Sequence, residues 1–252
     1  MMPSMFRTVF SFASASAIAF GVSLAAQQPA PGSARAVAPV DLTGNWVSIV
    51  TEDWRFRMVT PPVKDYASVP LNAAARAIAD KWDPAKDEAE GNACKSYGAA
   101  NIMRVPGRLH ISWQDDQTLK IEADAGTQTR LFYFTSPQSQ GEGWQGASKA
   151  AWQTIAAGGR GNAPANQSGS LKVVTTKLKA GYIRRNGVPY SENATLTEYY
   201  DLVTEANGDT YLVLTSKLED PMYLTEPLVT AAHFRKQTDG AGWKPTSCGL
   251  MR

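Results

Sequence analysis

The strongest constraint on the fold is an alternation of apolar and polar residues from position 108 to position 134. Two stretches, Arg108-Leu-His-Ile-Ser-Trp113 and Thr118-Leu-Lys-Ile-Glu-Ala123, place every second side chain on an apolar face, and Thr129-Arg-Leu-Phe-Tyr-Phe134 follows at once. A period of two is what a β-strand with one buried face requires. We therefore predict consecutive antiparallel strands here, in a protein that is mainly β.

The register of the first two strands follows from the same pattern, because a slip of one residue would turn every side chain to the other face. A four-residue loop at 114–117 would set apolar side chains against charged ones, whereas a five-residue loop at 114–118 sets apolar against apolar. We predict the second register. Its cross-strand pairs are Trp113–Leu119, Ile111–Ile121, Leu109–Ala123, His110–Glu122 and Arg108–Asp124.

The N-terminal residues indicate export. Residues 9–26 are apolar or small, they follow Arg7, and small residues at 23–26 offer a cleavage site. This pattern is typical of a signal peptide rather than of a membrane anchor. Residues 27–40 are rich in Pro, Ala and Gly and are expected to form a disordered linker. We expect one folded domain, residues 41–252.

Charge and cysteine content narrow the class of protein. The chain has 25 Lys and Arg against 23 Asp and Glu, a near-neutral balance that argues against nucleic acid or an anionic membrane as the main partner. Cys94 and Cys248 are the only cysteines. An even pair in an exported protein favours a disulfide, and two free thiols or a metal site are the alternatives.

A further strand is predicted before the hairpin. Trp54, Phe56 and Met58 alternate with Arg55 and Arg57. The two arginines would lie on a solvated outer face, or would line the lumen of a barrel if the apolar face points outward.

The remaining segments predict one helix and more strands. Asn72 is expected to cap a helix from Ala73 to about Trp82. Residues 84–92 are expected to form an exposed loop or another helical turn, residues 94–107 to be irregular, and the polar, low-complexity residues 156–170 to be a mobile loop. Further strands are predicted at 171–178, 193–203, 211–218 and 228–236, with turns at 186–187 and 207–209.

These elements predict an all-β domain with one short helix, built as a closed antiparallel barrel of eight or nine strands; a β-sandwich is the alternative. Gly44-Asn45-Trp46, at the start of the domain, resembles the Gly-x-Trp that closes the barrel floor in lipocalins. The resemblance implies a lipocalin-like (calycin) barrel.

Six short motifs in the chain are informative together. They are Cys94-x-x-x-Gly98, Met103-x-x-Pro106, Trp144-Gln-Gly-x-Ser148-x-x-x-Trp152, Asn186-Gly-Val-Pro-Tyr-Ser-Glu192, Leu196-Thr-Glu198 and Asp220-Pro-x-Tyr-Leu-Thr-x-Pro227. These motifs resemble a set of exported bacterial single-domain β proteins with no function attached. That resemblance implies a periplasmic or secreted protein and transfers no catalytic residue.

The sequence favours chemistry without a cofactor. With only two histidines, His110 and His233, a three-His zinc site is excluded. A site of two histidines and a carboxylate would need both histidines on one wall of the lumen, and we expect no metal. No Gly-x-Ser-x-Gly elbow and no phosphate-binding loop motif is present. A His110–Glu122 pair that faces a lumen would suit proton transfer, whereas on the outer wall it would be a solvated pair.

Arg130 shares its face with Phe132 and Phe134, so its buried guanidinium needs a partner or a ligand. Arg, Glu and Tyr inside a lipocalin-like barrel resemble, at the level of the fold, the phenolic acid decarboxylases. The expected catalytic residues are His110, Glu122, Arg130 and Glu198. The expected ligand-binding residues are Trp54, Arg55, Arg57, Phe132, Tyr133 and Tyr200, and Tyr199 is a further tyrosine that could orient a ligand.

Three functions fit these patterns. The first is binding of a small aromatic or apolar, carboxylated molecule and its conversion by acid–base chemistry of the lyase, decarboxylase or isomerase type. It requires at least two titratable groups inside the barrel. The second is a carrier, which requires a mainly apolar lumen. The third is an envelope interaction module that uses residues 156–170, Trp144 and Trp152, and it predicts a filled lumen and an exposed apolar patch.

Overall fold

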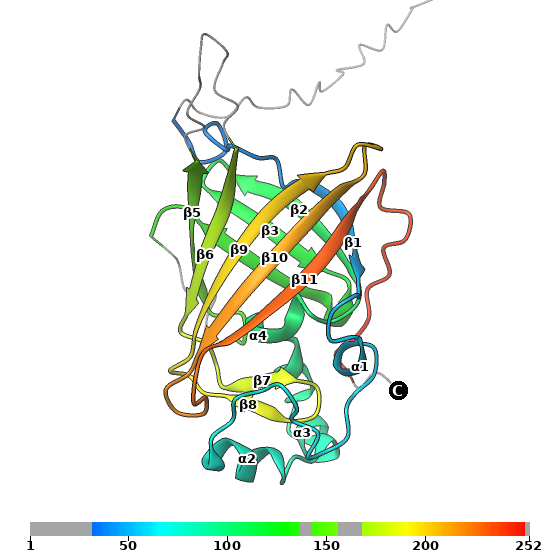
Figure 1. The fold of residues 1–252 in the computed structure, drawn as a ribbon, viewed down its shortest axis with the longest axis vertical. Helices are drawn as coiled ribbons and strands as arrows, with labels where there is room; N and C mark the ends of the chain where they lie inside the picture. Colours follow the sequence, from blue (N-terminus) through cyan, green and yellow to red (C-terminus); the bar gives the residue numbers. More distant parts are fainter. Residues whose placement is uncertain (1–31, 137–142, 156–167, 250–252) are drawn as a thin grey trace, which may run out of the picture.

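The computed structural model of the protein describes residues 32–136, 143–155 and 168–249. The predicted signal peptide and residues 156–167 of the predicted mobile loop lie outside these ranges. The main body is a closed β-barrel, the upper part of Figure 1. Its strands follow one another around the ring in the order β1 (Gly44–Ile49), β11 (Leu228–Gln237), β10 (Thr210–Glu219), β9 (Thr195–Thr204), β6 (Ser168–Thr176), β5 (Ala147–Ile155), β4 (Gln128–Tyr133), β3 (Thr118–Ala123) and β2 (Arg108–Asp115).

The closed all-β barrel predicted from the sequence is confirmed, but one pair of strands is parallel. Phe132 of β4 lies opposite Ser148 of β5 with the two strands running in the same direction, and the other neighbours in the ring are antiparallel. A ring with an odd number of strands cannot alternate in direction all the way round. The parallel pair is therefore a consequence of closing nine strands.

The predicted register of the β2–β3 hairpin is confirmed. Trp113 pairs with Leu119, Ile111 with Ile121, Leu109 with Ala123 and His110 with Glu122. The loop is tighter than expected, because a bulge after Trp113 lets Asp115 pair with Thr118. The expected Arg108–Asp124 pair takes another form, in which the Asp124 carboxylate accepts the backbone N–H of Arg108 at 2.7 Å.

The strand predicted at residues 54–59 is wrong. Trp54–Arg57 forms one turn of helix, α1, which begins after Asp53 in a left-handed conformation (φ 48°). The sequence alternation fits a strand, but β1 already pairs with β11 on one edge and with β2 on the other. No edge of the barrel is left for this segment, so the chain turns away below it.

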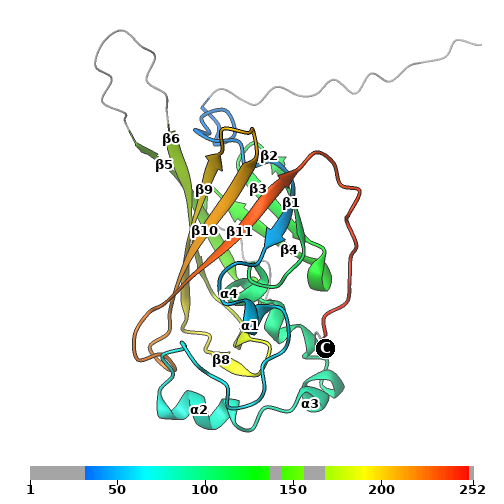
Figure 2. The same ribbon diagram turned by 45° about the vertical axis from the view of Figure 1, so that its right-hand side comes forward.

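A layer of short elements closes the lower end of the barrel in Figures 1 and 2. The helix predicted at residues 73–82 is confirmed in a shorter form, since Asn72 caps it by accepting the backbone N–H of Ala75 at 2.9 Å. The layer contains α2 (Ala73–Ala79), α3 (Pro84–Ala89), the 3-10 helix η1 (Ala93–Tyr97), α4 (Ala99–Ile102) and a hairpin of β7 (Gly181–Arg184) and β8 (Val188–Tyr190). A second 3-10 turn, η2 (Ala125–Thr127), lies between β3 and β4.

The predicted disulfide is present. Cys94 and Cys248 are bonded, with their Cα atoms 5.1 Å apart. The bond joins η1 of the lower layer to the C-terminal segment, which runs down the outside of the barrel in Figure 2. It therefore ties two parts of the chain that are 154 positions apart in sequence.

The described part of the expected linker is held against the barrel. Ser33 and Ala34 are buried, and the Trp152 indole N–H donates to the carbonyl oxygen of Ala34 at 2.8 Å. The backbone N–H of Arg35 donates to the carbonyl oxygen of Asp116 at 3.1 Å. These contacts place residues 33–35 against the barrel.

The barrel interior is packed with side chains. Trp46 of the Gly44-Asn45-Trp46 motif is fully buried, and its indole N–H donates to the carbonyl oxygen of Leu42 at 3.0 Å. A side chain with zero exposed area has no water-sized void beside it. The lumen residues with zero exposure are Trp46, Phe132, Leu171, Val173, Thr175, Tyr200 and Leu212.

Candidate functional site

One polar network lies inside the barrel. The Arg130 guanidinium donates to both carboxylate oxygens of Glu198, at 2.8 and 2.6 Å, and to the Tyr200 hydroxyl at 3.4 Å. It also donates to Thr175 Oγ1 at 3.3 Å, and Thr175 is hydrogen-bonded to Ser148 at 2.8 Å. The Arg130 and Glu198 side chains are 2% and 1% exposed. The partner that the sequence required for Arg130 is therefore Glu198.

Arg130 and Tyr200 hold their protons tightly in this network. Burial alone would lower the pKa of Arg130, but the adjacent Glu198 carboxylate outweighs it and raises that pKa. Burial and the Glu198 charge raise the pKa of Tyr200 well above its ordinary value. Arg130 and Tyr200 therefore keep their protons at neutral pH, and with no water-sized space beside Tyr200 the network resembles a structural ion pair.

The other expected catalytic pair lies outside the barrel. The His110 and Glu122 side chains are 45% and 33% exposed, and His110 Nδ1 lies 3.2 Å from Glu122 Oε2. Burial opposes ionisation of Glu122, but hydrogen bonds from Lys120 and His110 outweigh it and lower the pKa of Glu122. His110–Glu122 is thus the solvated outer-wall pair, and the barrel wall separates it from Arg130 and Glu198.

The expected ligand-binding residues are dispersed. Phe132 and Tyr200 lie in the packed lumen, with their ring centroids 5.6 Å apart, whereas Tyr133 and Tyr199 are half-buried residues of β4 and β9. The three residues of α1 lie below the barrel. Of these, Trp54 is exposed, Arg55 pairs with Asp65, and Arg57 is buried and pairs with Glu52.

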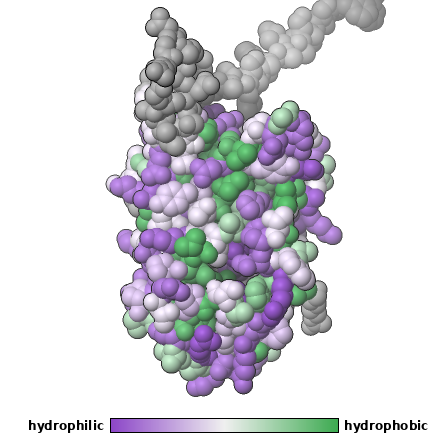
Figure 3. Space-filling view, in the orientation of Figure 1, coloured by the Kyte–Doolittle hydropathy of each residue, from purple (hydrophilic) through white to green (hydrophobic). Residues whose placement is uncertain are grey.

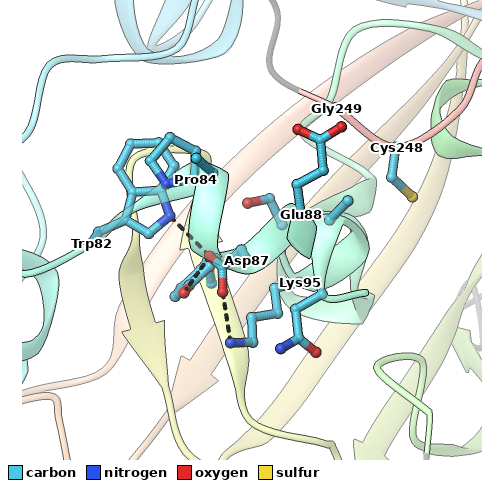
Figure 4. A pocket seen from close by; sticks show the side chains of 12 residues that line it. Trp82, Pro84, Asp87, Glu88, Lys95, Cys248 and Gly249 are labelled. Atoms are coloured by element: carbon cyan, nitrogen blue, oxygen red, sulfur yellow. Dashed lines mark hydrogen bonds and ion pairs between the residues drawn. The ribbon is translucent and has the colours of Figure 1, made fainter. Parts of the chain in front are cut away.

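A pocket that the sequence did not predict lies in the lower layer, between α3, η1, β7 and the C-terminal segment (Figure 4). Its volume is about 240 Å³. We call it the base pocket. It is lined by Trp82, Pro84, Ala85, Asp87, Glu88, Asn92, Ala93, Lys95, Ser96, Tyr182, Cys248 and Gly249.

Asp87 organises the base pocket. Its carboxylate accepts hydrogen bonds from the Trp82 indole at 3.2 Å, from Lys95 Nζ at 2.8 Å and from the Tyr182 hydroxyl at 2.7 Å. The dashed lines in Figure 4 mark the bonds from Trp82 and Lys95. Burial and the Asp87 charge raise the pKa of Tyr182, so its hydroxyl remains a donor. Because these three side chains donate to the Asp87 carboxylate, the walls of the base pocket are positioned before any ligand enters.

Local sequence explains how these groups are positioned. Asp83 caps α3 by accepting the N–H groups of Ala85 and Lys86, and Pro84 occupies the first turn, where no N–H is needed. At Gly187 (φ 81°) a Cβ would overlap the Trp82 side chain. The turn at Asn186-Gly187 was predicted from the sequence, whereas Asp83-Pro84 is a helix-start signal that the predictions above did not use. Neither indicates that α3 and β7 meet.

No group of three or more His, Cys, Asp and Glu side chains that could hold a metal ion occurs within residues 32–136, 143–155 and 168–249. Within the same ranges no helix has the length and apolar character needed to cross a membrane.

No protein-family model, no curated protein and no solved structure matches the chain. The likeness to lipocalins therefore stands on the closed barrel alone, and the likeness to phenolic acid decarboxylases has no further support.

Proposed function

We propose that this protein is an exported carrier that binds a small aromatic or apolar, carboxylated molecule in the base pocket. The observation that carries the proposal is the pocket itself, a cavity of about 240 Å³ with one apolar side and polar groups already fixed by Asp87. Preformed, partly apolar cavities with a few oriented polar groups are the usual sites for small molecules. This volume is slightly below their usual range of about 300–1,000 Å³, so the ligand is no larger than about a single-ring aromatic acid.

The two parts of such a ligand have separate partners. Its ring packs against Trp82, Pro84 and Ala85, and its carboxylate pairs with Lys95, the one cation among the lining residues. Lys95 Nζ donates one of its three N–H groups to Asp87, and the other two can donate to the ligand carboxylate. Glu88 is exposed, so solvent and salt screen its repulsion of a carboxylate.

Conversion of the ligand by acid–base chemistry, as in a decarboxylase, stays a prediction. The residues expected to perform it lie in two places, because Arg130 and Glu198 are in the packed lumen and His110 and Glu122 are on the outer wall. For this reason we favour the carrier over the enzyme.

Calorimetric titration with phenylacetate, phenylacetamide and phenethylamine tests the proposal. The three probes share a ring and differ in charge. We expect phenylacetate to bind most tightly, with a Kd of about 10 μM to 1 mM for a ligand of this size. Tighter binding of the amine would refute the role of Lys95, and no binding of any probe would refute the proposal.

Variants locate the binding. Lys95→Met should weaken phenylacetate binding and leave phenylacetamide binding unchanged. Ala85→Phe should block all three probes by filling the pocket. Lys86→Met is the matched control for Lys95→Met, because it removes a lysine of α3 that is 71% exposed and does not line the base pocket.

A second candidate, the envelope interaction module, is favoured by the packed lumen. Apolar and aromatic side chains on the outer wall, Ile49, Val203, Tyr211 and Val213, line an open groove beside His233. Hydrophobic residues also lie between hydrophilic ones over the barrel face in Figure 3. Trp144 and Trp152, expected at the contact surface, are half-buried, and their indole N–H groups donate to Ala180 and Ala34. Pull-down of an envelope protein that is lost on Val213→Glu would support the module.

A further inference from the structure

Four arginine side chains are buried together directly beneath the barrel. Arg57 belongs to α1, Arg104 follows α4, Arg184 ends β7 and Arg185 comes next in the chain. In Figures 1 and 2, α1 and α4 lie between the barrel and the β7–β8 hairpin. The four residues are 2%, 7%, 5% and 2% exposed, respectively. Together with Phe56, Asn101 and Val105 they line one small cavity, and we call this group the arginine site.

Burying a guanidinium group is costly unless a counter-charge accompanies it. Arg57 pairs with Glu52, and Arg104 Nη2 lies 2.7 Å from Asp53 Oδ2. Arg184 and Arg185 form no ion pair with any described carboxylate. Arg185 donates to the backbone carbonyl of Arg57, and the Arg184 guanidinium lies 3.9 Å from the centre of the Phe56 ring.

Some buried N–H donors of the arginine site also lack a hydrogen-bond partner among the described residues. Nη2 of Arg57, Nη1 of Arg184 and Nη1 of Arg185 are buried and have no hydrogen-bond partner among the described residues. Buried polar groups in native proteins nearly always have partners, so three unpaired donors around one cavity need an explanation. They come from three guanidinium groups on two separate segments of the chain.

The charge balance indicates which partner is missing. Five guanidinium groups face three carboxylates, which leaves an excess of two positive charges. The groups are Arg55, Arg57, Arg104, Arg184 and Arg185 against Glu52, Asp53 and Asp65. Burial, and then the charge of Arg104, lowers the pKa of Arg184 to about 10, so Arg184 is still charged at neutral pH. A monoanion would balance only half of this excess.

We propose that the arginine site binds a tetrahedral dianion, either free phosphate or the phosphate group of a small organic molecule. Arg57, Arg184 and Arg185 each donate to one of its oxygens. Guanidinium groups match phosphate oxygens in geometry and bind them through charge-assisted hydrogen bonds. A single water is a poorer occupant, because it accepts two hydrogen bonds and brings no charge.

The cavity between the side chains, about 10 Å³, holds no more than a water. Entry of a phosphate therefore requires one side chain of this cavity to move outward. α1 is a single turn long, with Trp54 and Met58 exposed on its outer side and Arg57 held by its pair with Glu52. Its half-buried Phe56 ring packs against Arg184 and is the side chain that must swing away.

Calorimetric titration of the purified, disulfide-bonded protein tests the proposal. The probes are inorganic phosphate, phenyl phosphate, benzoate and chloride, at constant ionic strength and at slightly alkaline pH, where phosphate is a dianion. We expect saturable binding of phosphate that is at least about tenfold tighter than binding of benzoate or chloride. Phosphate binding no tighter than chloride or benzoate binding would overturn the proposal. Phenyl phosphate binding at least as tightly as inorganic phosphate identifies an organic phosphate as the ligand, and weaker binding identifies free phosphate.

Arg184→Met should weaken phosphate binding without weakening the fold, so it is tested by both a binding and a stability measurement. It should weaken phosphate binding about 10- to 100-fold. It should also leave the ligand-free protein at least as resistant to urea, because it removes a buried charge that has no partner. Arg184→Lys keeps the positive charge but loses the planar set of guanidinium N–H donors, so it should bind phosphate with intermediate affinity. Unchanged phosphate binding in both variants would overturn the assignment.

Two controls separate this site from the rest of the molecule. Arg76→Met removes an exposed arginine of α2 and should change neither phosphate binding nor stability. Ala85→Phe blocks the base pocket and should leave phosphate binding intact. Loss of phosphate binding in Ala85→Phe would place the anion in the base pocket and refute the arginine site.

Discussion

The ion pair inside the barrel makes a quantitative prediction about stability. Glu198→Gln removes the negative charge with almost no change of shape and leaves the Arg130 cation unpaired in a tightly packed lumen. The two side chains are 2% and 1% exposed and share two hydrogen bonds. Breaking a pair buried to this degree costs about 3–5 kcal/mol. For a domain of this size, we expect the urea midpoint to fall by about 1–2 M.

A triple variant separates the cost of the broken pair from the value of the intact one. Arg130→Met, Glu198→Leu and Tyr200→Phe together replace the charges and the Tyr200 hydroxyl, which donates to Glu198 at 3.1 Å. Thr175 keeps Ser148 as a partner. Because no polar group is then left unpaired, we expect the triple variant to lie within about 1–2 kcal/mol of the wild type.

The assay is urea unfolding at neutral pH with the disulfide intact, followed by tryptophan fluorescence and by circular dichroism. Glu219→Gln is the matched control, since Glu219 pairs with Lys217 at 2.9 Å on the surface and both are more than 40% exposed. It should cost less than about 0.5 kcal/mol. Equal effects of Glu198→Gln and Glu219→Gln would refute the argument, as would a triple variant as unstable as Glu198→Gln.

Other predictions concern the disulfide, acid stability and the base pocket. Replacing Cys94 and Cys248 by Ala should destabilise the protein by at most about 4–5 kcal/mol, measured by urea unfolding, and no loss would contradict the chain-entropy argument. Because the pKa of Glu122 is lowered from 4.5, its ionised form stabilises the fold above about pH 4.5, and this contribution is lost as the pH falls through the lowered pKa. Glu122→Gln should therefore make the urea midpoint less sensitive to acid, and an unchanged pH profile would count against it. Gly187→Ala should cost about 1 kcal/mol or more in urea unfolding and weaken phenylacetate binding by displacing Trp82, and wild-type stability and binding would contradict this.

The fold class and much of the local pairing could be predicted from the sequence. The alternation in β2 and β3 was enough to predict the register, because only one register sets apolar against apolar residues. In the strand predicted at 193–203, the same period of two puts Leu196, Glu198 and Tyr200 on one face, and all three are buried in β9. It also indicated that Arg130 needs a buried partner, although Glu198 was not identified as that partner.

The predictions failed where the structure of a segment depends on residues that are far from it in the sequence. Trp54–Arg57 alternates like a strand, but both edges of β1 are occupied. The His110–Glu122 pairing was predictable and its side of the wall was not, since a period of two defines two faces without saying which one points inward. The base pocket and the arginine site were not predicted, because each is lined by residues from segments that are far apart in the sequence.

By itself, the sequence determined that this protein is a mainly β domain with a specific hairpin register, a capped helix and a pair of cysteines able to bond. These properties depend on neighbours in sequence or on the matching of apolar faces. The tertiary structure alone decided the parallel closure of nine strands, the inner face of the barrel and the meeting of four arginines from three distant segments. Such properties arise from contacts between residues far apart in the chain, and local periodicity contains no information about them.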